Sequence, residues 1–327
     1  MQSLCEYCEV IPLNSAELRS RKDDAAASWF GLGHLDRVIN SKCPFCRLVT
    51  QAIHQDYIAN PEDGVATSRL DPVNVVWSND LGPGKRGAFY VYGVRKCIIY
   101  FAGDETQTTD GGDDDGFLRS SISPDLDYHR IGQWISSCEA THTVHCGDGY
   151  TPKQFSDAYP GLEVLRLIDV ESYCLVRVQD VRRYVALSYV WGGVASVRLA
   201  TSNLEQMLRI NGIKAAWSRL PKTITDTILL AQKLQIRYVW VDALCLIQDD
   251  EDDLRRGINV MDNIYERAHL TVVAAYGHNA NAGLPGIAKN SRMRTESIDV
   301  RKNIHMRVFM ELDGMLDSTV YQTRGWT

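Results

Sequence analysis

A short stretch from Ile236 to Asp250, IRYVWVDALCLIQDD, most constrains how this chain can fold. It opens with the β-favouring run Tyr238–Val241, whose lack of polar alternation is typical of a strand buried on both faces of a parallel sheet. Polar and ionisable groups follow the run at once: Asp242, Cys245, Gln248, Asp249 and Asp250. Ligands of open α/β sheets bind at the carboxyl ends of the strands, so this edge is the first candidate site. The alternative is a strand followed by an ordinary polar loop.

Alternating strands and helices are predicted around this stretch. The strands are Leu165–Val170, Cys174–Val178, Tyr184–Val190 and Leu270–Ala275, the last of them fully apolar, and the main helices are Thr223–Leu234 and a stripe from Asp252 to Ala268. This alternation indicates an α/β fold with a doubly wound, mainly parallel sheet flanked by helices. Its carboxyl edge would gather Ser188–Gly193, Asp242–Asp250 and Tyr276–Gly286. Ser202 and Glu205 have capping-box spacing and predict a short helix that ends near Ile210.

Four blocks of this half carry a family resemblance. They are Tyr184–Gly193 (YVALSYVWGG), Leu220–Asp226 (LPKTITD), the stretch at Ile236–Asp250, and Arg324–Thr327 (RGWT). In this order they resemble the fungal heterokaryon-incompatibility (HET) domain over Leu165–Thr327. HET domains are distantly similar to the Toll/interleukin-receptor (TIR) fold, so the resemblance implies a TIR-like sheet and a role in self/non-self recognition and cell-death signalling. Members usually continue through a Gln-Glu pair, so the sequence is either a fragment or has lost that part.

The resemblance also implies a catalytic position. Enzymatic TIR domains cleave NAD with a glutamate on the helix after such an acidic loop, and HET domains usually have Asp-Trp-x-x-Glu there, followed four residues on by a methionine. Anchored at Met261, this pattern falls on Asp253–Gly257, so glycine occupies the position of the glutamate. Glycine cannot move a proton, so cleavage of NAD as a substrate would need another acid. The candidates at the same edge are Asp242, Asp249, Asp250 and Glu251.

The candidate pocket lies at the same strand ends. Its predicted residues are Ser188, Tyr189, Trp191, Gly192, Gly193, Cys245, Gln248, Arg324 and Trp326. Paired with Arg324, Asp242 would be a structural clamp between the central stretch and the last block, which is the alternative to a catalytic role. Tryptophan and tyrosine walls suit a flat apolar ligand. No base adjoins Cys245 in the sequence, so a buried thiol is the expectation there.

Cysteine pairs predict a metal site near the amino terminus. The chain has nine cysteines, and Cys5, Cys8, Cys43 and Cys46 form two CxxC pairs that can complete a closed, structural four-thiolate zinc site. The alternative is four buried thiols in a helical module. On a helix, Cys138, His142 and Cys146 would share one face and form a possible second metal cluster. The alternative there is a helix whose cysteines and histidine pack against neighbours.

Three segments are predicted. Residues 1–60 form a cysteine-paired, mainly helical module with helices over Ser15–Asn40 and Cys46–Tyr57. Residues 61–160 contain a β-hairpin, an acidic loop and the Cys/His helix, with strands at Val73–Trp77 and Phe89–Phe101. Residues 161–327 form the HET domain, which ends within its last block.

Composition and charge limit the kinds of partner that this chain can bind. The net charge of −6 and the lack of a basic stripe argue against nucleic-acid binding. No apolar run approaches the roughly 20 residues needed to cross a bilayer. We therefore expect a soluble cytoplasmic protein that binds a small molecule or a protein partner. Besides a HET recognition role, two functions stay open: a secondary-metabolite cyclase that folds an apolar substrate, and a non-catalytic interaction module.

Overall fold

The computed structural model describes residues 3–14, 17–18, 29–59, 70–79, 87–94, 97–102, 125–142, 154–289, 291, 297–310, 316 and 319–323. They belong to two compact units, each with its own hydrophobic core. The first unit combines Met1–Ser123 with Met293–Gln322, and the second combines Pro124–Arg292 with Thr323–Thr327. These cuts differ from the three predicted segments, because strands near residue 300 join the sheet of the first unit. Within the described ranges, no helix combines the length and apolar character needed to cross a membrane.

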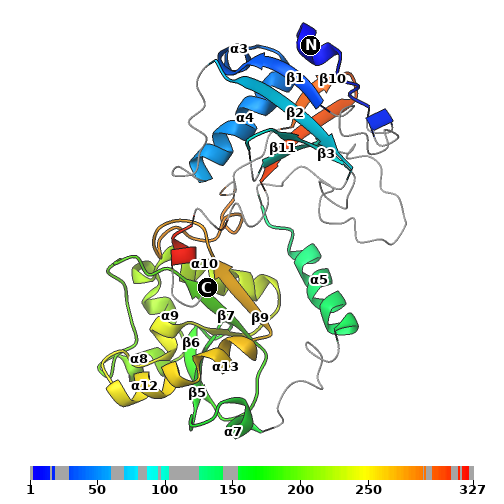
Figure 1. Ribbon diagram of the computed structural model, residues 1–327. Coiled ribbons are helices and arrows are strands. Elements are labelled where there is room, and N and C mark those ends of the chain that lie inside the picture. The colour runs from blue at the N-terminus through cyan, green and yellow to red at the C-terminus, as the bar shows by residue number, and fades with distance from the viewer. Residues whose placement is uncertain are drawn as a thin grey trace. The chain divides into compact units, whose positions relative to one another are not determined.

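An antiparallel sheet with a helix against it forms the first unit (Figure 1). Its elements are α1 (Glu6–Glu9), β1 (Trp29–His34), α3 (Leu35–Ile39), α4 (Pro44–Ala59), β2 (Pro72–Ser78), β3 (Ala88–Val91), β4 (Cys97–Ala102), β10 (Ile298–Arg301) and β11 (Ile304–Met310). The strand order is β1-β2-β3-β4-β11-β10. Helix α4 packs on β4, β11 and β10, so residues far apart in sequence share one core.

Two predictions for the first unit need correction. Residues 29–34, predicted to be helical, form strand β1, in which Trp29 pairs with Val76. Gly31 and Gly33 disfavour a helix here. The backbone φ of Gly33 is 81°, a value that residues other than glycine rarely adopt. The predicted strand at Phe89–Phe101 is two strands, β3 and β4. The predictions of a helix from Cys46 and of a strand at Val73–Trp77 are confirmed.

A mixed five-stranded sheet, ordered β6-β5-β8-β7-β9, forms the second unit (Figure 1). Its elements are α5 (Tyr128–Thr141), α7 (Phe155–Ala158), β5 (Leu165–Asp169), β6 (Cys174–Val178), β7 (Tyr184–Tyr189), α8 (Leu204–Leu208), α9 (Gly212–Ala215), a 3-10 turn η4 (Trp217–Arg219), α10 (Lys222–Lys233), β8 (Tyr238–Trp240), α11 (Asp242–Cys245), α12 (Glu251–Asn259), α13 (Met261–Glu266) and β9 (Leu270–Ala274). The predicted mixture of sheet and helices is confirmed.

The parallel arrangement covers only part of this sheet. Strands β8, β7 and β9 are parallel, as predicted, whereas β5 is antiparallel to both β6 and β8. The short connection from β5 to β6 permits only an antiparallel pair, and Tyr173 in it takes a left-handed φ of 49°. Strand β9 is also not fully buried as predicted, because it lies at the edge of the sheet and leaves Val273 44% exposed.

Aromatic side chains fix helix α13 on strands β7 and β8. The Tyr184 hydroxyl donates to the carbonyl of Ile264 at 2.5 Å, and the Tyr265 hydroxyl donates to that of Leu187 at 3.2 Å. The ring of Tyr265 also meets buried Trp240 edge to face, with centroids 5.4 Å apart. These contacts therefore set the position of α13 against β7 and β8.

Two local predictions in this unit are wrong. The stripe from Asp252 to Ala268 forms two helices, because the buried Val260 leaves helical geometry with φ −120° and ψ 16°. Ser202 does not cap α8 in a capping box. Asn203 precedes that helix instead, and its Oδ1 accepts from the Ala200 amide at 2.9 Å.

Candidate functional site

The carboxyl ends of β7 and β8 bring two predicted site residues together. Asp242 starts α11 directly after β8, and Trp191 follows β7. Trp191 Nε1 donates to Asp242 Oδ2 at 3.1 Å, and the Ala243 amide donates to Asp242 Oδ1 at 2.7 Å. Because the two strands are parallel, their ends meet at one edge. We call this place the strand-end edge.

The glycine pair after Trp191 fits a close backbone approach. Gly192 has a φ of 63°, and a Cβ there would lie 2.3 Å from the Cβ of Asn279. The Ala280 amide also donates to the Trp191 carbonyl at 3.3 Å. The loop after β9 therefore joins the strand-end edge, as predicted. At Gly193 a Cβ would meet open space.

Two of the candidate acids stabilise local structure. Asp249 Oδ1 accepts from the amide of Thr201 at 2.7 Å and from its hydroxyl at 3.1 Å. The bond from this amide lowers the pKa of Asp249. Asp250 caps α12, since its Oδ1 accepts from the amides of Asp252 and Asp253, both at 3.0 Å. Such caps stabilise a helix by about 1 kcal/mol. The fourth candidate, Glu251, is exposed in the first turn of that helix.

A buried ion pair lies below this edge and was not predicted. Asp253 contacts the guanidinium of Arg166, which is 7% exposed, and accepts from the Ile247 amide at 2.9 Å. Arg166 Nε also donates to the Cys245 carbonyl at 3.0 Å. The pair ties β5 to the segment between α11 and α12. An arginine inside the apolar run LRLIDV was its signal in the sequence.

Gly257, where the sequence pattern predicts the family glutamate, is buried against the same segment. A Cβ on Gly257 would lie 2.3 Å from Cδ2 of Leu246 and 3.0 Å from its Cδ1. Leu246 is itself buried, at 5% exposure. This helix position therefore faces packed core, and it offers no room for an acidic side chain without movement of Leu246.

The remaining predicted pocket residues in the described part are mostly core residues. Ser188 and Tyr189 are buried in β7. Burial raises the pKa of the Cys245 thiol to about 12, so this cysteine is no thiolate nucleophile, as expected. Gln248 Nε2 donates to the carbonyls of Asp242 at 3.1 Å and Leu246 at 3.0 Å. Arg324 and Trp326 lie outside the described residues, so the clamp between Asp242 and Arg324 stays a prediction.

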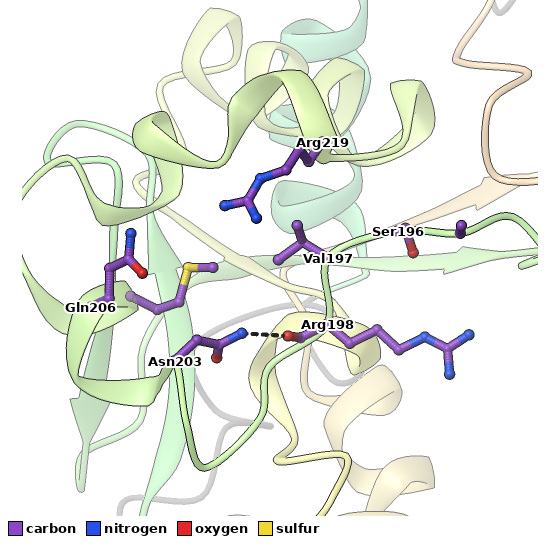
Figure 2. A pocket seen from close by; sticks show the side chains of 8 residues that line it. Ser196, Val197, Arg198, Asn203, Gln206 and Arg219 are labelled. Atoms are coloured by element: carbon purple, nitrogen blue, oxygen red, sulfur yellow. Dashed lines mark hydrogen bonds between the residues drawn. The ribbon is translucent and has the colours of Figure 1, made fainter.

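Beside the strand-end edge lies an open cavity of about 510 Å³. It is lined by the loop at Ser196–Arg198, by Asn203 and Gln206, and by Arg219. Figure 2 shows the Arg219 guanidinium directed into it, whereas the Arg198 side chain extends away. The Arg198 guanidinium instead lies 4.5 Å from the ring centroid of Trp191. Its lining residues include no carboxylate and two cations, so this cavity supplies no acid for proton transfer.

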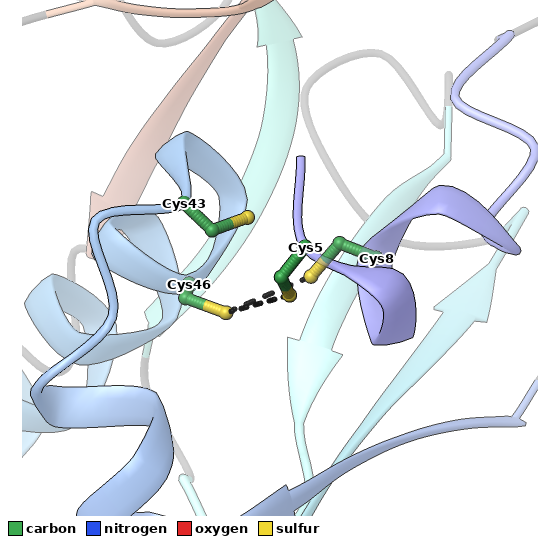
Figure 3. Close-up of side chains that lie close together, drawn as sticks. All are labelled: Cys5, Cys8, Cys43 and Cys46. Carbon is green, nitrogen blue, oxygen red and sulfur yellow. Dashed lines mark hydrogen bonds between the residues drawn. The ribbon is translucent and has the colours of Figure 1, made fainter. Parts of the chain in front are cut away.

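Four cysteines converge in the first unit, as the CxxC spacing predicts. Cys5 precedes α1 and Cys8 lies in it, whereas Cys43 and Cys46 lie at the start of α4. Figure 3 shows the four side chains directed toward one another. All four sulfurs lie within 4.8 Å of each other, and Cys46 Sγ is 3.8 Å from Cys5 Sγ and 3.6 Å from Cys8 Sγ.

These spacings fit a tetrahedral metal ion. Zn–S bonds of about 2.3 Å place the sulfurs of a tetrahedral site about 3.8 Å apart, whereas a disulfide would need about 2.05 Å. The four cysteines are free thiols in the structure. Hydrogen bonding to Cys46 and Cys8 lowers the pKa of Cys43, which favours its thiolate, and bonding to Cys43 raises the pKa of Cys8. The cluster can therefore hold a metal such as zinc.

The second predicted cluster is described only in part. Helix α5 carries Cys138, and His142 follows its last turn, with Cys138 Sγ and His142 Nδ1 3.4 Å apart. Cys146 lies outside the described residues. Two groups do not complete a metal site, so this cluster stays a prediction.

Comparisons with known proteins agree with the four sequence blocks. The family model "Heterokaryon incompatibility protein (HET)" matches residues 184–327. The heterokaryon incompatibility protein 6, OR allele, of Neurospora crassa is 23% identical over 160 residues, which cover 42% of this chain and 22% of that protein. The match therefore spans about a fifth of the length of this relative. No solved structure matches the chain. Residues 184–327 thus match the heterokaryon-incompatibility (HET) domain, the family that the four sequence blocks resemble.

Proposed function

We propose that this chain acts in fungal self/non-self recognition and cell-death signalling, with the strand-end edge binding a protein partner or a small molecule. The HET match and the incompatibility protein among its relatives support this role. A TIR-like origin of the sheet belongs to the same proposal, supported by the parallel order of β8, β7 and β9.

In this proposal the chain signals without cleaving NAD. The observation that carries it is the packing of Gly257 against Leu246, at the position where the sequence pattern predicts the family glutamate. The other acids support the reasoning: Asp249 holds Thr201 and Asp250 caps α12. The hydrogen bonds from Thr201 lower the pKa of Asp249, so this carboxylate is a poor proton donor. Asp242, held by Trp191, then acts as a structural group of the edge.

The metal part of the proposal is one structural Zn²⁺ bound by Cys5, Cys8, Cys43 and Cys46. The sulfur spacings support it. Bound zinc would join α1 to the start of α4 through four closed coordination positions, leaving none for a substrate. Its role would therefore be to stabilise the first unit.

A secondary-metabolite cyclase is the second candidate and has less support. Folding an apolar substrate needs an enclosed apolar pocket. The cavity beside the strand-end edge is open and is lined partly by Arg198, Arg219 and amide side chains. A non-catalytic interaction module, the third candidate, differs from our proposal only in lacking the signalling output.

Two assays test the proposal. First, the purified chain is incubated with NAD and the products are identified by mass; we expect no nicotinamide release. Release by the wild type, lost in Glu251→Gln, would overturn the non-catalytic part and identify the replacement acid.

Second, the chain is expressed from an inducible promoter in a filamentous fungus that lacks it. We expect growth arrest, abolished by Asp242→Ala because Trp191 and the Ala243 amide lose their acceptor. The matched control is Asp262→Ala, which removes an exposed carboxylate from α13. Normal growth with well-expressed wild-type chain would contradict the signalling role and leave the interaction module.

A further inference from the structure

Arg37 contacts both cysteine pairs of the metal cluster. It lies in α3, and its Nη1 donates to Cys5 Sγ at 3.4 Å while Nη2 donates to Cys46 Sγ at 3.5 Å. Cys5 belongs to the first CxxC pair and Cys46 to the second. The two ends of one planar guanidinium therefore span the two halves of the cluster.

Two further contacts and the lack of a side chain at Gly33 fix this side chain. Arg37 Nε donates to the Leu32 carbonyl at 2.7 Å, and the guanidinium lies 4.2 Å from the ring centroid of Tyr7. Gly33 makes room on another side, since a Cβ there would lie 3.0 Å from Arg37 Nε. Tyr7 stands between Cys5 and Cys8 in the sequence. The geometry is therefore built around Arg37, and a long side chain held this way loses little further entropy when it binds.

Charge explains why such a group is needed. Four thiolates around a divalent cation carry a net charge of −2, and Cys8, Cys43 and Cys46 are buried. Burying uncompensated charge costs free energy, and a guanidinium cancels half of this excess. Donors to the ligand atoms also orient them, as outer-shell partners of metal sites generally do.

We propose that Arg37 is a positioning residue of the metal site, which strengthens metal binding and protects the Cys5 and Cys46 thiolates from reaction. This inference rests on the proposed zinc site. Cys5 is the one ligand that is only partly buried. A metal-bound thiolate is already deprotonated, and hydrogen bonds to its sulfur lower its nucleophilicity, so Arg37 shields the ligand that reagents reach first.

The experiment compares the zinc-loaded chain with Arg37→Gln, Arg37→Lys and a matched control, Arg47→Gln. Arg47 is exposed and follows Cys46 directly in α4. Zinc affinity is measured by competition with a chromophoric chelator, and ligand reactivity by the rate of alkylation with iodoacetamide. Cobalt(II) substitution adds a spectroscopic readout, since the thiolate-to-metal charge-transfer band reports the hydrogen bonds to sulfur.

For Arg37→Gln we expect zinc affinity to fall about 10- to 100-fold, the usual loss for an outer-shell partner. Alkylation should accelerate, first at Cys5, and the cobalt charge-transfer band should shift. Arg37→Lys keeps the positive charge but lacks the two-ended guanidinium. Its zinc affinity and alkylation rate should therefore lie between those of Arg37→Gln and the wild type. If Arg37→Gln cannot be purified in folded form, Arg37→Lys is compared with the wild type and with Arg47→Gln instead.

Two results would overturn the inference, and they are distinguishable. If wild type binds zinc and both Arg37 variants match Arg47→Gln in affinity, alkylation and cobalt spectrum, then Arg37 has no role in the site while the zinc proposal stands. If the wild type binds no zinc or cobalt, the zinc proposal fails and this inference fails with it.

Discussion

The two units differ in the polar groups that their cores contain. In the first unit the polar groups that converge in the core are four thiols, three of them buried. In the second unit the core contains hydrogen-bonded polar and charged side chains instead. Of the seven buried polar residues in the described part, six belong to this unit: Arg166, Asp169, Ser188, Thr223, Asp226 and Thr227.

This difference bears on function. Several charged groups in the second unit bind two neighbours, as when Asp253 contacts Arg166 and accepts from the Ile247 amide. Releasing such a carboxylate from its partner for catalysis costs free energy, because the partner would remain buried and unpaired. The first unit concentrates its reactive groups in one cluster. Of the four predictions below, one tests whether the first unit depends on a metal, two test ion pairs of the second unit, and one tests how tightly the second unit is packed.

The largest effect is expected for Cys8→Ser, which removes a buried ligand of the cluster. Structural zinc sites contribute about 10 kcal/mol of binding free energy, so the first unit should lose cooperative folding while the second keeps it. Hydrogen exchange resolved to peptides measures both units in one sample. The control is Cys97→Ser, a buried cysteine of β4 outside the cluster. Equal loss of protection in the two variants would show that burial alone explains the effect.

Next in size is Asp253→Ala in the second unit. It leaves the guanidinium of Arg166 buried without its carboxylate, which should lower the free energy of unfolding by about 3–5 kcal/mol. The matched control is Asp252→Ala, whose partner Arg255 is 64% exposed, and it should cost less than about 1 kcal/mol. Denaturant titration checks both. If the two variants lose similar free energies of unfolding, the buried ion pair contributes no more than the exposed one.

Local sequence patterns predicted much of this architecture. They did not predict which residues far apart in the sequence contact each other. The run Tyr238–Val241 predicted β8 and its polar exit, and the CxxC spacing predicted the four-cysteine cluster. Arg166 and Asp253 stand 87 positions apart, and no spacing rule connects them. The same holds for β11, whose pairing with β4 joins residues near 100 and 305.

Misassigned elements have a local cause. The apolar residues of Trp29–His34 suit a helix as well as a strand, and Gly31 and Gly33 favour the strand. The antiparallel β5 was missed because apolar runs look alike in parallel and antiparallel pairs when both faces are buried. The packing of Gly257 on Leu246 could not be predicted from the sequence, because no spacing rule connects the two residues.

A smaller effect is expected for Gly257→Ala, which tests how tightly α12 packs on Leu246. Alanine favours a helix over glycine by about 1 kcal/mol, but its Cβ would meet Leu246 Cδ2 at 2.3 Å. Overpacking usually costs about 1–3 kcal/mol, so we expect net destabilisation. Gly132→Ala in α5 is the control, since nothing lies within 4 Å of its Cβ position, and it should stabilise. Destabilisation that disappears in the Leu246→Ala background would assign the clash to that contact.

The smallest effect concerns Asp169, whose Oδ2 accepts from Arg237 Nε at 3.0 Å and from Nη2 at 2.7 Å. Burial alone would raise the pKa of Asp169, but these bonds and two backbone amides lower it below its ordinary value. A folded-state pKa below the unfolded value of about 3.9 stabilises the fold above that pH, and this stability is lost as pH falls through the folded pKa.

The second unit should therefore lose stability below about pH 4, and Asp169→Asn should flatten this part of the profile. Thermal unfolding of the second unit between pH 2.5 and 6 measures both curves. Asp180→Asn is the control, because Asp180 also pairs with an arginine, Arg182, but is 59% exposed and screened by water. If both variants change the profile equally, burial of Asp169 adds nothing, and the contrast between buried and exposed pairs fails at this position.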